Sequence, residues 1–282
     1  MRVSLSITQY PSGPDHTPLE RVVQAADEGG LDTVWVADHL VQHAPATQPT
    51  DPILESFTTL GWLAAHSSRV RLGTMVAAVA FRPPTLLIKA VSTLDALTGG
   101  RAWLGVGTGY DEREAAEMGL PLPPVQQRYA LLEETLQLAH RMFAGDDSPF
   151  LGRHVRAERP RNHPTPARRP RILVGGAGEK RTLPLVARYA DACNLFDIPD
   201  GGATLRRKLA VLAEACEAVG RPYEEIEKTV GTLLWPDESP AAFADRCAAL
   251  RELGLDHAVV ITRTPWTDGD LARLVEGARV GR

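Results

Sequence analysis

Short apolar runs alternate along the chain with longer stretches in which apolar residues recur at helical spacing. The short runs are typical of buried β-strands and the longer stretches of amphipathic helices. The pattern predicts strands at residues 3–8, 33–37, 70–76, 102–106, 171–174, 192–196, 229–234 and 258–261. It predicts helices between them at residues 19–28, 53–66, 85–97, 128–143, 180–189, 203–219, 240–253 and 268–278.

This alternation indicates an α/β protein with parallel strands, because each crossover between parallel strands needs a helix. Eight strand–helix units favour a closed (β/α)8 TIM barrel, and a doubly wound open sheet is the alternative. At 282 residues the chain suits one barrel with insertions, so we expect a single domain over residues 1–282. Insertion loops are expected near 39–52 and 145–170, on the C-terminal side of the strands where lids and binding loops lie.

Composition excludes several classes of protein. A net charge of -4 gives no indication of a nucleic-acid partner. The first residues predict a strand and are too polar for a signal peptide, and no apolar run approaches the length of a membrane span. Cys193, Cys216 and Cys247 are widely spaced, which predicts buried thiols in a reducing compartment. We therefore expect a cytoplasmic protein with a small-molecule substrate and no membrane partner.

A glycine-rich turn follows the predicted strand at 171–174. It reads Gly175, Gly176, Ala177 and Gly178, and a helix is predicted from residue 180. Such a turn gathers backbone N–H groups at the positive end of a helix dipole, and glycine lets an anion approach the backbone closely. The pattern indicates a phosphate-binding turn, although an ordinary tight strand-to-helix turn fits it equally well.

Two other strand ends carry candidate chemistry. Asp38 and His39 follow the second strand, and a carboxylate beside an imidazole suits proton transfer, although a capping Asp and a packed His also fit. Gly105, Gly107 and Gly109 thin one face of the fourth strand, which would let a flat ring lie against the backbone. No His-x-His or His-Glu-x-x-His cluster occurs, so no metal site is expected.

An ordered set of segments carries a resemblance to a known family. The segments are Asp-His at 38–39, Gly-Thr-Met-Val at 73–76, Leu-Thr-Gly-Gly-Arg-Ala-Trp-Leu-Gly-Val-Gly at 97–107, Glu-Arg-Glu at 112–114, Gly-Gly-Ala-Gly-Glu-Lys-Arg-Thr-Leu at 175–183 and Tyr-Ala-Asp-Ala-Cys-Asn at 189–194. Together they resemble the bacterial luciferase-like superfamily, in particular its coenzyme F420-dependent oxidoreductase branch. Each segment is weak evidence alone, whereas the ordered set is specific.

The resemblance implies a (β/α)8 barrel that holds a deazaflavin ring at the strand ends. It implies catalytic roles for His39, which would exchange a proton, and for Asp38, which would hold His39 or touch the ring. It implies a non-prolyl cis peptide at Met75–Val76 that backs the ring. The implied cofactor contacts are Asp38, Thr74, Met75, Val76, Gly107, Gly175, Gly176, Ala177 and Gly178, the implied substrate contacts are His43 and Tyr110, and the family's habit implies a homodimer.

One departure limits the substrate. The sugar-phosphate dehydrogenase branch carries a Trp soon after Asp-His and an acid directly after the Gly-Thr-Gly of the fourth strand. This chain has Leu-Val-Gln-His-Ala at 40–44 and Tyr110 at the second position. We therefore do not expect a sugar-phosphate substrate.

The resemblance implies hydride transfer between F420 and a small organic substrate, and apolar strand ends favour an apolar pocket. An alternative is an FMN-dependent monooxygenase that receives reduced flavin from a separate reductase, and a second alternative is a non-catalytic cofactor-binding barrel. The loop at 153–169 is rich in arginine, and a cationic rim would attract the phosphodiester and oligoglutamate tail of F420. A solvated loop with scattered arginines fits this segment as well.

Overall fold

The computed structural model describes residues 1–11, 18–42 and 47–281. The strands are β1 (Arg2–Ile7), β2 (Thr33–Val36), β3 (Arg71–Thr74), β4 (Ala77–Ala78), β5 (Ala102–Gly107), β6 (Phe150–Leu151), β7 (Arg156–Ala157), β8 (Arg171–Gly175), β9 (Ala192–Phe196), β10 (Glu227–Leu233) and β11 (His257–Ile261). The helices are α1 (Leu19–Gly29), α2 (Ser56–Ala65), α3 (Pro84–Thr98), α4 (Glu112–Glu117), α5 (Val125–Phe143), α6 (Thr182–Tyr189), α7 (Ala203–Ala218), α8 (Pro240–Glu252), α9 (Asp268–Val280) and the 3-10 turn η1 (Tyr223–Glu225). Every predicted strand and helix is present, whereas β4, β6, β7, α4 and η1 were not predicted.

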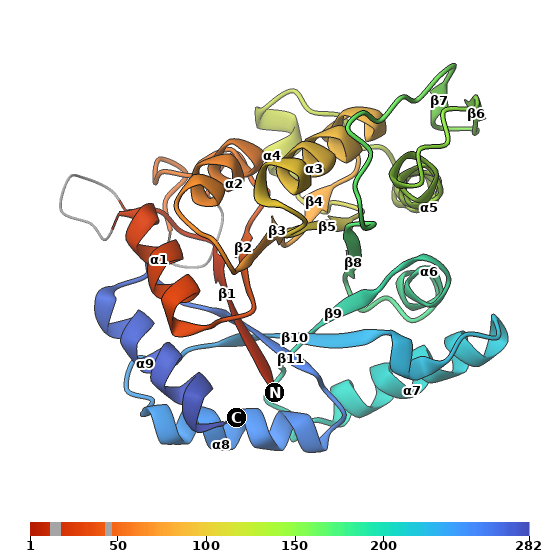
Figure 1. The fold of residues 1–282 in the computed structure, drawn as a ribbon. Coiled ribbons are helices and arrows are strands. Elements are labelled where there is room, and N and C mark those ends of the chain that lie inside the picture. The colour runs from red at the N-terminus through yellow and green to blue at the C-terminus, as the bar shows by residue number, and fades with distance from the viewer. Residues whose placement is uncertain (12–17, 43–46, 282) are drawn as a thin grey trace.

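The strands close into a ring of parallel strands surrounded by helices (Figure 1). The order is β1, β2, β3, β5, β8, β9, β10 and β11, and β11 pairs again with β1. Leu5 of β1, for example, lies opposite Val34 on one side and Val260 on the other. The short β4 continues the line of β3 along β5. The ring confirms the predicted (β/α)8 barrel and excludes the open sheet.

Alternate residues of each strand face the inside of the barrel, because side chains along a strand have a period of two. Trp35, Trp103, Leu173 and Val259 form a buried cluster there, with Met75 and Val76 packed against it. Among these side chains the two indole rings lie 5.5 Å apart. The barrel is therefore a filled core rather than a pore, and this cluster is the floor beneath any site at its mouth.

The layer between strands and helices holds the larger apolar core, which includes the predicted buried thiols Cys193, Cys216 and Cys247. Helix ends follow local signals that the sequence carries. Pro240 opens α8 directly after Ser239, whose hydroxyl accepts a hydrogen bond from a backbone N–H in the first turn. No helix in the described part of the chain has both the length and the apolar character needed to cross a bilayer.

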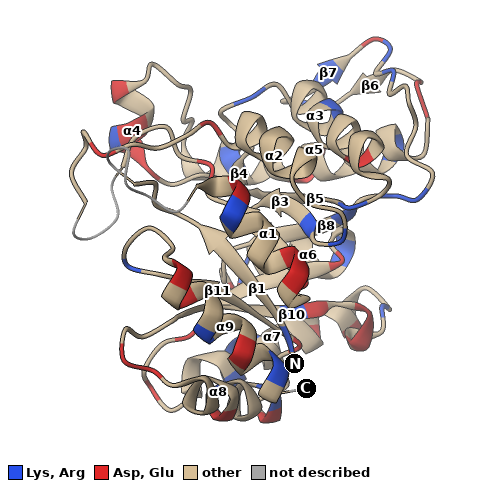
Figure 2. Cartoon of the chain, turned by 60° about the vertical axis from the view of Figure 1, so that its left-hand side comes forward, with Lys and Arg blue, Asp and Glu red and all other residues tan. Residues whose placement is uncertain are grey.

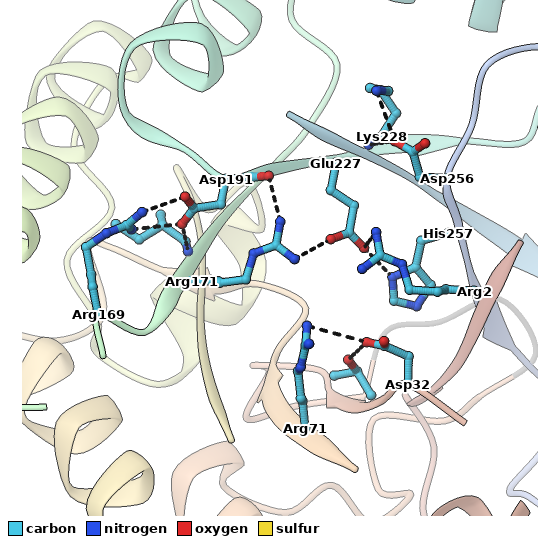
Figure 3. Close-up of polar contacts among 12 residues, drawn as sticks. Arg2, Asp32, Arg71, Arg169, Arg171, Asp191, Glu227, Lys228, Asp256 and His257 are labelled. Atoms are coloured by element: carbon cyan, nitrogen blue, oxygen red, sulfur yellow. Dashed lines mark hydrogen bonds and ion pairs between the residues drawn. The ribbon is translucent and has the colours of Figure 1, made fainter. Parts of the chain in front are cut away.

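Ion pairs gather at the N-terminal ends of several barrel strands (Figure 3). Glu227 at the start of β10 accepts a hydrogen bond from His257 at 2.7 Å and pairs with Arg171 at 2.6 Å and Arg2 at 3.0 Å. Burial alone would raise the pKa of Glu227, but the hydrogen bond from His257 and these charges outweigh it and lower the pKa to about 2. This rim serves stability, as is general for the N-terminal face of such barrels.

The loop at 145–170 does not lie where the sequence analysis expected it. It leads from the end of α5 to the start of β8, so it returns to the N-terminal rim rather than the C-terminal side. Arg159 pairs with Asp147 at 2.8 Å, and Arg169 pairs with Asp191, before β9, at 2.6 Å. Figure 2 shows the β6–β7 hairpin on the side of the molecule away from α4, which follows β5 at the mouth. The arginine-rich loop therefore does not form a cationic rim at the mouth.

Candidate active site

Two adjoining cavities occupy the C-terminal mouth of the barrel. The first, of about 410 Å³, is lined by residues at or just after the C-terminal ends of β2, β3, β5, β8 and β9, and we call it the glycine cavity. The second, of about 810 Å³, is lined by the ends of β1, β2, β9, β10 and β11, and we call it the β11 cavity. Both are lined in part by the same residues, which are His39, Met75, Tyr110, Asn194 and Phe196.

The glycine cavity brings together two places that the sequence analysis singled out. Asp38 and His39 line it from the end of β2, and Gly175 and Gly176 line it from the end of β8. The C-terminal ends of parallel strands meet at one rim, which is why segments far apart in sequence share this cavity. His43, predicted to contact substrate, lies outside the described residues.

A buried carboxylate holds His39. Oε2 of Glu114 lies 2.8 Å from Nδ1 of His39, and Oε1 accepts hydrogen bonds from the backbone N–H groups of Leu40 and Val41. Burial would raise the pKa of Glu114, but the hydrogen bonds from His39 and Leu40 lower it below its ordinary value. Glu114 therefore stays ionised near neutral pH, which favours the proton on Nδ1 and directs Nε2 to any proton exchange.

Asp38 does not hold His39, which was one of its two predicted roles. Its carboxylate accepts two hydrogen bonds from the Arg82 guanidinium, at 2.7 and 2.9 Å, and one from the Ser56 hydroxyl at 2.6 Å. Arg82 also pairs with Glu55 at 2.6 Å, and the backbone N–H of Ala78 donates to Asp38 at 3.3 Å. The carboxylate on Nδ1 of His39 is thus that of Glu114, and Asp38 ties the start of α2 to the turn after β3.

The peptide bond between Met75 and Val76 is cis, as the resemblance implied. Val76 fits against the wall only because its neighbours are glycines: a Cβ added at Gly107 or Gly175 would lie 2.8 or 2.7 Å from Cγ2 of Val76. At Gly105 an added Cβ would lie 1.8 Å from the carbonyl oxygen of Thr74. The sequence analysis interpreted Gly105 and Gly107 as space for a flat ring. In the structure they also make room for the backbone of Thr74 and the side chain of Val76.

Thr74 is part of the same wall. It is buried, and its hydroxyl donates to the carbonyl oxygen of Gly105 at 2.7 Å. It is not among the residues that line either cavity, so the structure places this predicted cofactor contact behind the cavity surface. Met75, Val76 and Gly107 do line the glycine cavity.

The glycine turn presents its first two residues to the cavity. Gly176 has φ of 104°, a conformation that favours glycine, whereas Ala177 and Gly178 do not line the cavity. An added Cβ at Gly178 would lie 2.8 Å from Oγ1 of Thr182, which is 3.0 Å from the hydroxyl of Tyr129. Gly178 therefore allows tight packing at the start of α6, and Gly175 and Gly176 offer the backbone at which an anion could lie.

The sequence analysis gave no role to two charged residues of the site, Glu114 and Arg82. A signal for Glu114 is present: Asp111 accepts from the Glu114 N–H at 2.8 Å as the N-cap of α4, so an Asp-x-x-Glu pattern after β5 marks a helix start at the mouth. Across the described residues, no group of His, Cys, Asp or Glu is arranged to hold a metal ion.

Solved structures share this architecture across nearly the full chain. An F420-dependent secondary alcohol dehydrogenase in complex with an F420–acetone adduct matches with a TM-score of 0.85 at 16% identity, over 100% of this chain and 99% of the other. A riboflavin lyase with modified FMN and riboflavin matches with a TM-score of 0.82 at 15% identity, over 99% and 90%. At these identities the matches show the fold alone.

Sequence comparisons go further. An F420-dependent glucose-6-phosphate dehydrogenase of Kineococcus radiotolerans is 32% identical over 77% of this chain and 63% of its own length. The pyrimidine monooxygenase RutA of Acinetobacter baylyi is 30% identical over 61% of this chain and 47% of its own length. The first relatives are thus matched over about three fifths of their length. The family model for luciferase-like monooxygenases matches residues 2–273, so the strand-end glycines, the cis bulge and the buried His–Glu pair belong to a chain of the luciferase-like monooxygenase family.

Proposed function

We propose that this protein is an oxidoreductase that transfers a hydride between coenzyme F420 and a small organic substrate. The observation that carries the proposal is the glycine cavity, in which a carboxylate-held imidazole and an open glycine backbone share one surface. The similarity to F420-dependent glucose-6-phosphate dehydrogenases favours the deazaflavin over other cofactors. The volume of about 410 Å³ lies within the range usual for small-molecule sites.

The residues present fit such a cofactor. Met75 and Val76 would form the wall behind its ring, and the backbone of Gly175 and Gly176 would receive its phosphate, where a side chain at residue 175 would strike Val76. When bound, the deazaflavin supplies the hydride chemistry. His39 exchanges the accompanying proton through Nε2.

Three residues support that proton exchange without taking part in it. Glu114 keeps the proton of the neutral imidazole on Nδ1 and fixes the orientation of the ring. Asp38 and Arg82 fix the strand end that carries His39, because their paired hydrogen bonds join β2 to the turn after β3.

A binding titration tests the cofactor assignment. We expect fluorescence titration to show micromolar binding of the deazaflavin and much weaker binding of FMN. Gly176→Ala should weaken deazaflavin binding, whereas Gly100→Ala should not. Both glycines have positive φ, at 104° and 97°, so both variants carry a similar backbone cost, but only Gly176 lines the cavity. Binding of FMN with none of the deazaflavin would overturn the proposal.

A flavin-dependent monooxygenase is the second candidate, favoured by the similarity to a pyrimidine monooxygenase. It predicts substrate-dependent oxygen consumption with reduced FMN. A non-catalytic barrel predicts instead that His39→Ala leaves every turnover unchanged. For the proposed oxidoreductase, His39→Ala should retain deazaflavin binding and lose turnover, because acid–base catalysis contributes about 10²–10⁴-fold.

A further inference from the structure

The β11 cavity lies beside the glycine cavity and is the larger of the two. We propose that the β11 cavity is the substrate chamber and that it takes an apolar molecule carrying a carboxylate, which Arg263 binds at the rim. The part of this inference that concerns substrate rests on the proposed function. The binding preference itself does not.

The walls of this chamber are mainly apolar. Ile53, Phe196, Leu233, Val259 and Ile261 line it, together with neutral polar residues such as Gln42. Among the described residues that line it, none is Asp or Glu. A chamber of this kind favours hydrocarbon contact and offers no fixed negative charge that would repel an anion.

A buried hydroxyl lies in the wall of the chamber. Oγ of Ser6 on β1 is buried and has no hydrogen-bond partner among the described residues, and Ser6 lines the chamber. The hydroxyl of Ser4, two residues earlier on β1, has hydrogen-bond partners: it donates to the carbonyl of Ala258 at 3.4 Å and accepts from the Trp35 indole at 3.2 Å. This oxygen is closed off from solvent, so among the polar groups of the lining it is Arg263 that a carboxylate can reach.

Arg263 is the one permanently charged side chain among the described residues of the chamber lining. It follows β11, and its guanidinium lies over the Trp235 ring at 5.2 Å. Among the described residues no ion pair involves Arg263, whereas Arg246 and Arg273, on the neighbouring α8 and α9, pair with Glu238 and Asp270. A guanidinium stacked on an aromatic face at the edge of an apolar chamber is suited to carboxylate recognition.

Arg263 and His39 line the same chamber, and His39 also faces the glycine cavity. A molecule held by its carboxylate at Arg263 would therefore extend along the apolar wall toward His39. A carboxylate also occurs in the oligoglutamate tail of F420. That source differs because it brings no apolar segment to fill the chamber.

The test uses the full chain without cofactor and measures binding by thermal shift and by tryptophan fluorescence, to which Trp235 beneath Arg263 contributes. The probes are octanoate, octanamide and a γ-linked triglutamate. We expect octanoate to bind about tenfold more tightly than octanamide, the size of one hydrogen bond to a charged group. Arg263→Gln should remove that preference and leave octanamide binding unchanged, and Arg263→Lys should restore part of it. Arg113→Gln is the control, since Arg113 is exposed on α4 and pairs with Glu117.

Equal binding of octanoate and octanamide to the wild-type chain would overturn the inference, as would a preference that survives in Arg263→Gln. Tighter, Arg263-dependent binding of triglutamate than of octanoate would overturn the substrate assignment in favour of a cofactor tail. If deazaflavin does not bind but the preference for octanoate is intact, the proposed cofactor is rejected, while carboxylate binding by Arg263 in the β11 cavity is supported.

Discussion

Replacing Glu114 with Gln is the sharpest test of the site, because one buried carboxylate here accepts three hydrogen bonds. The donors are Nδ1 of His39 and the backbone N–H groups of Leu40 and Val41. The amide of Gln has one acceptor oxygen and an NH₂ group, so Nδ1 of His39 would either face another donor or lose its proton to Nε2. The side chain of Glu114 is 1% exposed, and water cannot easily replace the lost bond.

The expected cost follows from these contacts. Loss of a charge-assisted bond, with a buried donor left unpaired, is worth about 2–3 kcal/mol of unfolding free energy. For a chain of this size that corresponds to a fall of about 4–10 °C in Tm. Turnover should fall even where the variant is fully folded. We expect a fall of about 10²-fold in kcat with little change in KM, because His39 loses the partner that fixes its tautomer.

Three measurements check this prediction. Thermal unfolding gives the stability change, steady-state kinetics give the split between kcat and KM, and ¹⁵N NMR of the imidazole reports which ring nitrogen of His39 carries the proton. Glu112→Gln is the control, because Glu112 lies on the same helix and is exposed. The reasoning is refuted if Glu114→Gln keeps the wild-type Tm and the wild-type tautomer.

Three further predictions concern the rest of the barrel. Arg82→Gln should destabilise the chain by about 3 kcal/mol in urea unfolding, because it leaves the buried Asp38 carboxylate without its bidentate partner, and an unchanged urea midpoint would contradict this. The pKa of Glu227 is lowered from 4.5 to about 2, so the ionised carboxylate contributes about 3 kcal/mol to the free energy of unfolding above pH 5, and this contribution is lost as pH falls toward 2. In Glu227→Gln the free energy of unfolding should change much less between pH 5 and pH 2. Gly175→Ala should lower the free energy of unfolding by about 1–3 kcal/mol, because the added methyl group would lie 2.7 Å from the Val76 side chain. Gly61→Ala in α2 is the control and should be neutral or slightly stabilising, because nothing lies within 4 Å of the added methyl group; equal effects of the two variants would contradict the prediction.

The barrel could be predicted because its evidence is local: each strand and helix shows its own hydrophobic period, and their alternation allows few topologies. The cis bond at Met75–Val76 and the shared mouth of residues 38–39 and 175–176 came from the ordered motifs and are confirmed. The partner of His39 could not be found in this way. Glu114 is separated from it by 75 residues, and pairing across that distance depends on how β2 and β5 are placed around the ring.

Two interpretations were wrong for the same physical reason, that packing decides what a local pattern is used for. Gly105 was read as space for a ring, but the carbonyl oxygen of Thr74 occupies that space, whereas Gly107 lines the glycine cavity and stays a predicted ring contact. The arginine-rich loop was placed at the mouth, but a helix-to-strand connection in a parallel barrel returns to the opposite rim. There Arg169 pairs with Asp191 instead of meeting a ligand.

The two rims of the barrel use buried charge in different ways. At the N-terminal rim Glu227 is surrounded by Arg2, Arg171 and His257, so its charge is compensated within the protein and serves folding. At the mouth only one of the two buried carboxylates pairs with an arginine. Arg82 neutralises Asp38, whereas Glu114 accepts hydrogen bonds from backbone N–H groups and from His39. A carboxylate held in that way orients the imidazole, so Glu114 positions His39 for the proton exchange proposed at the mouth.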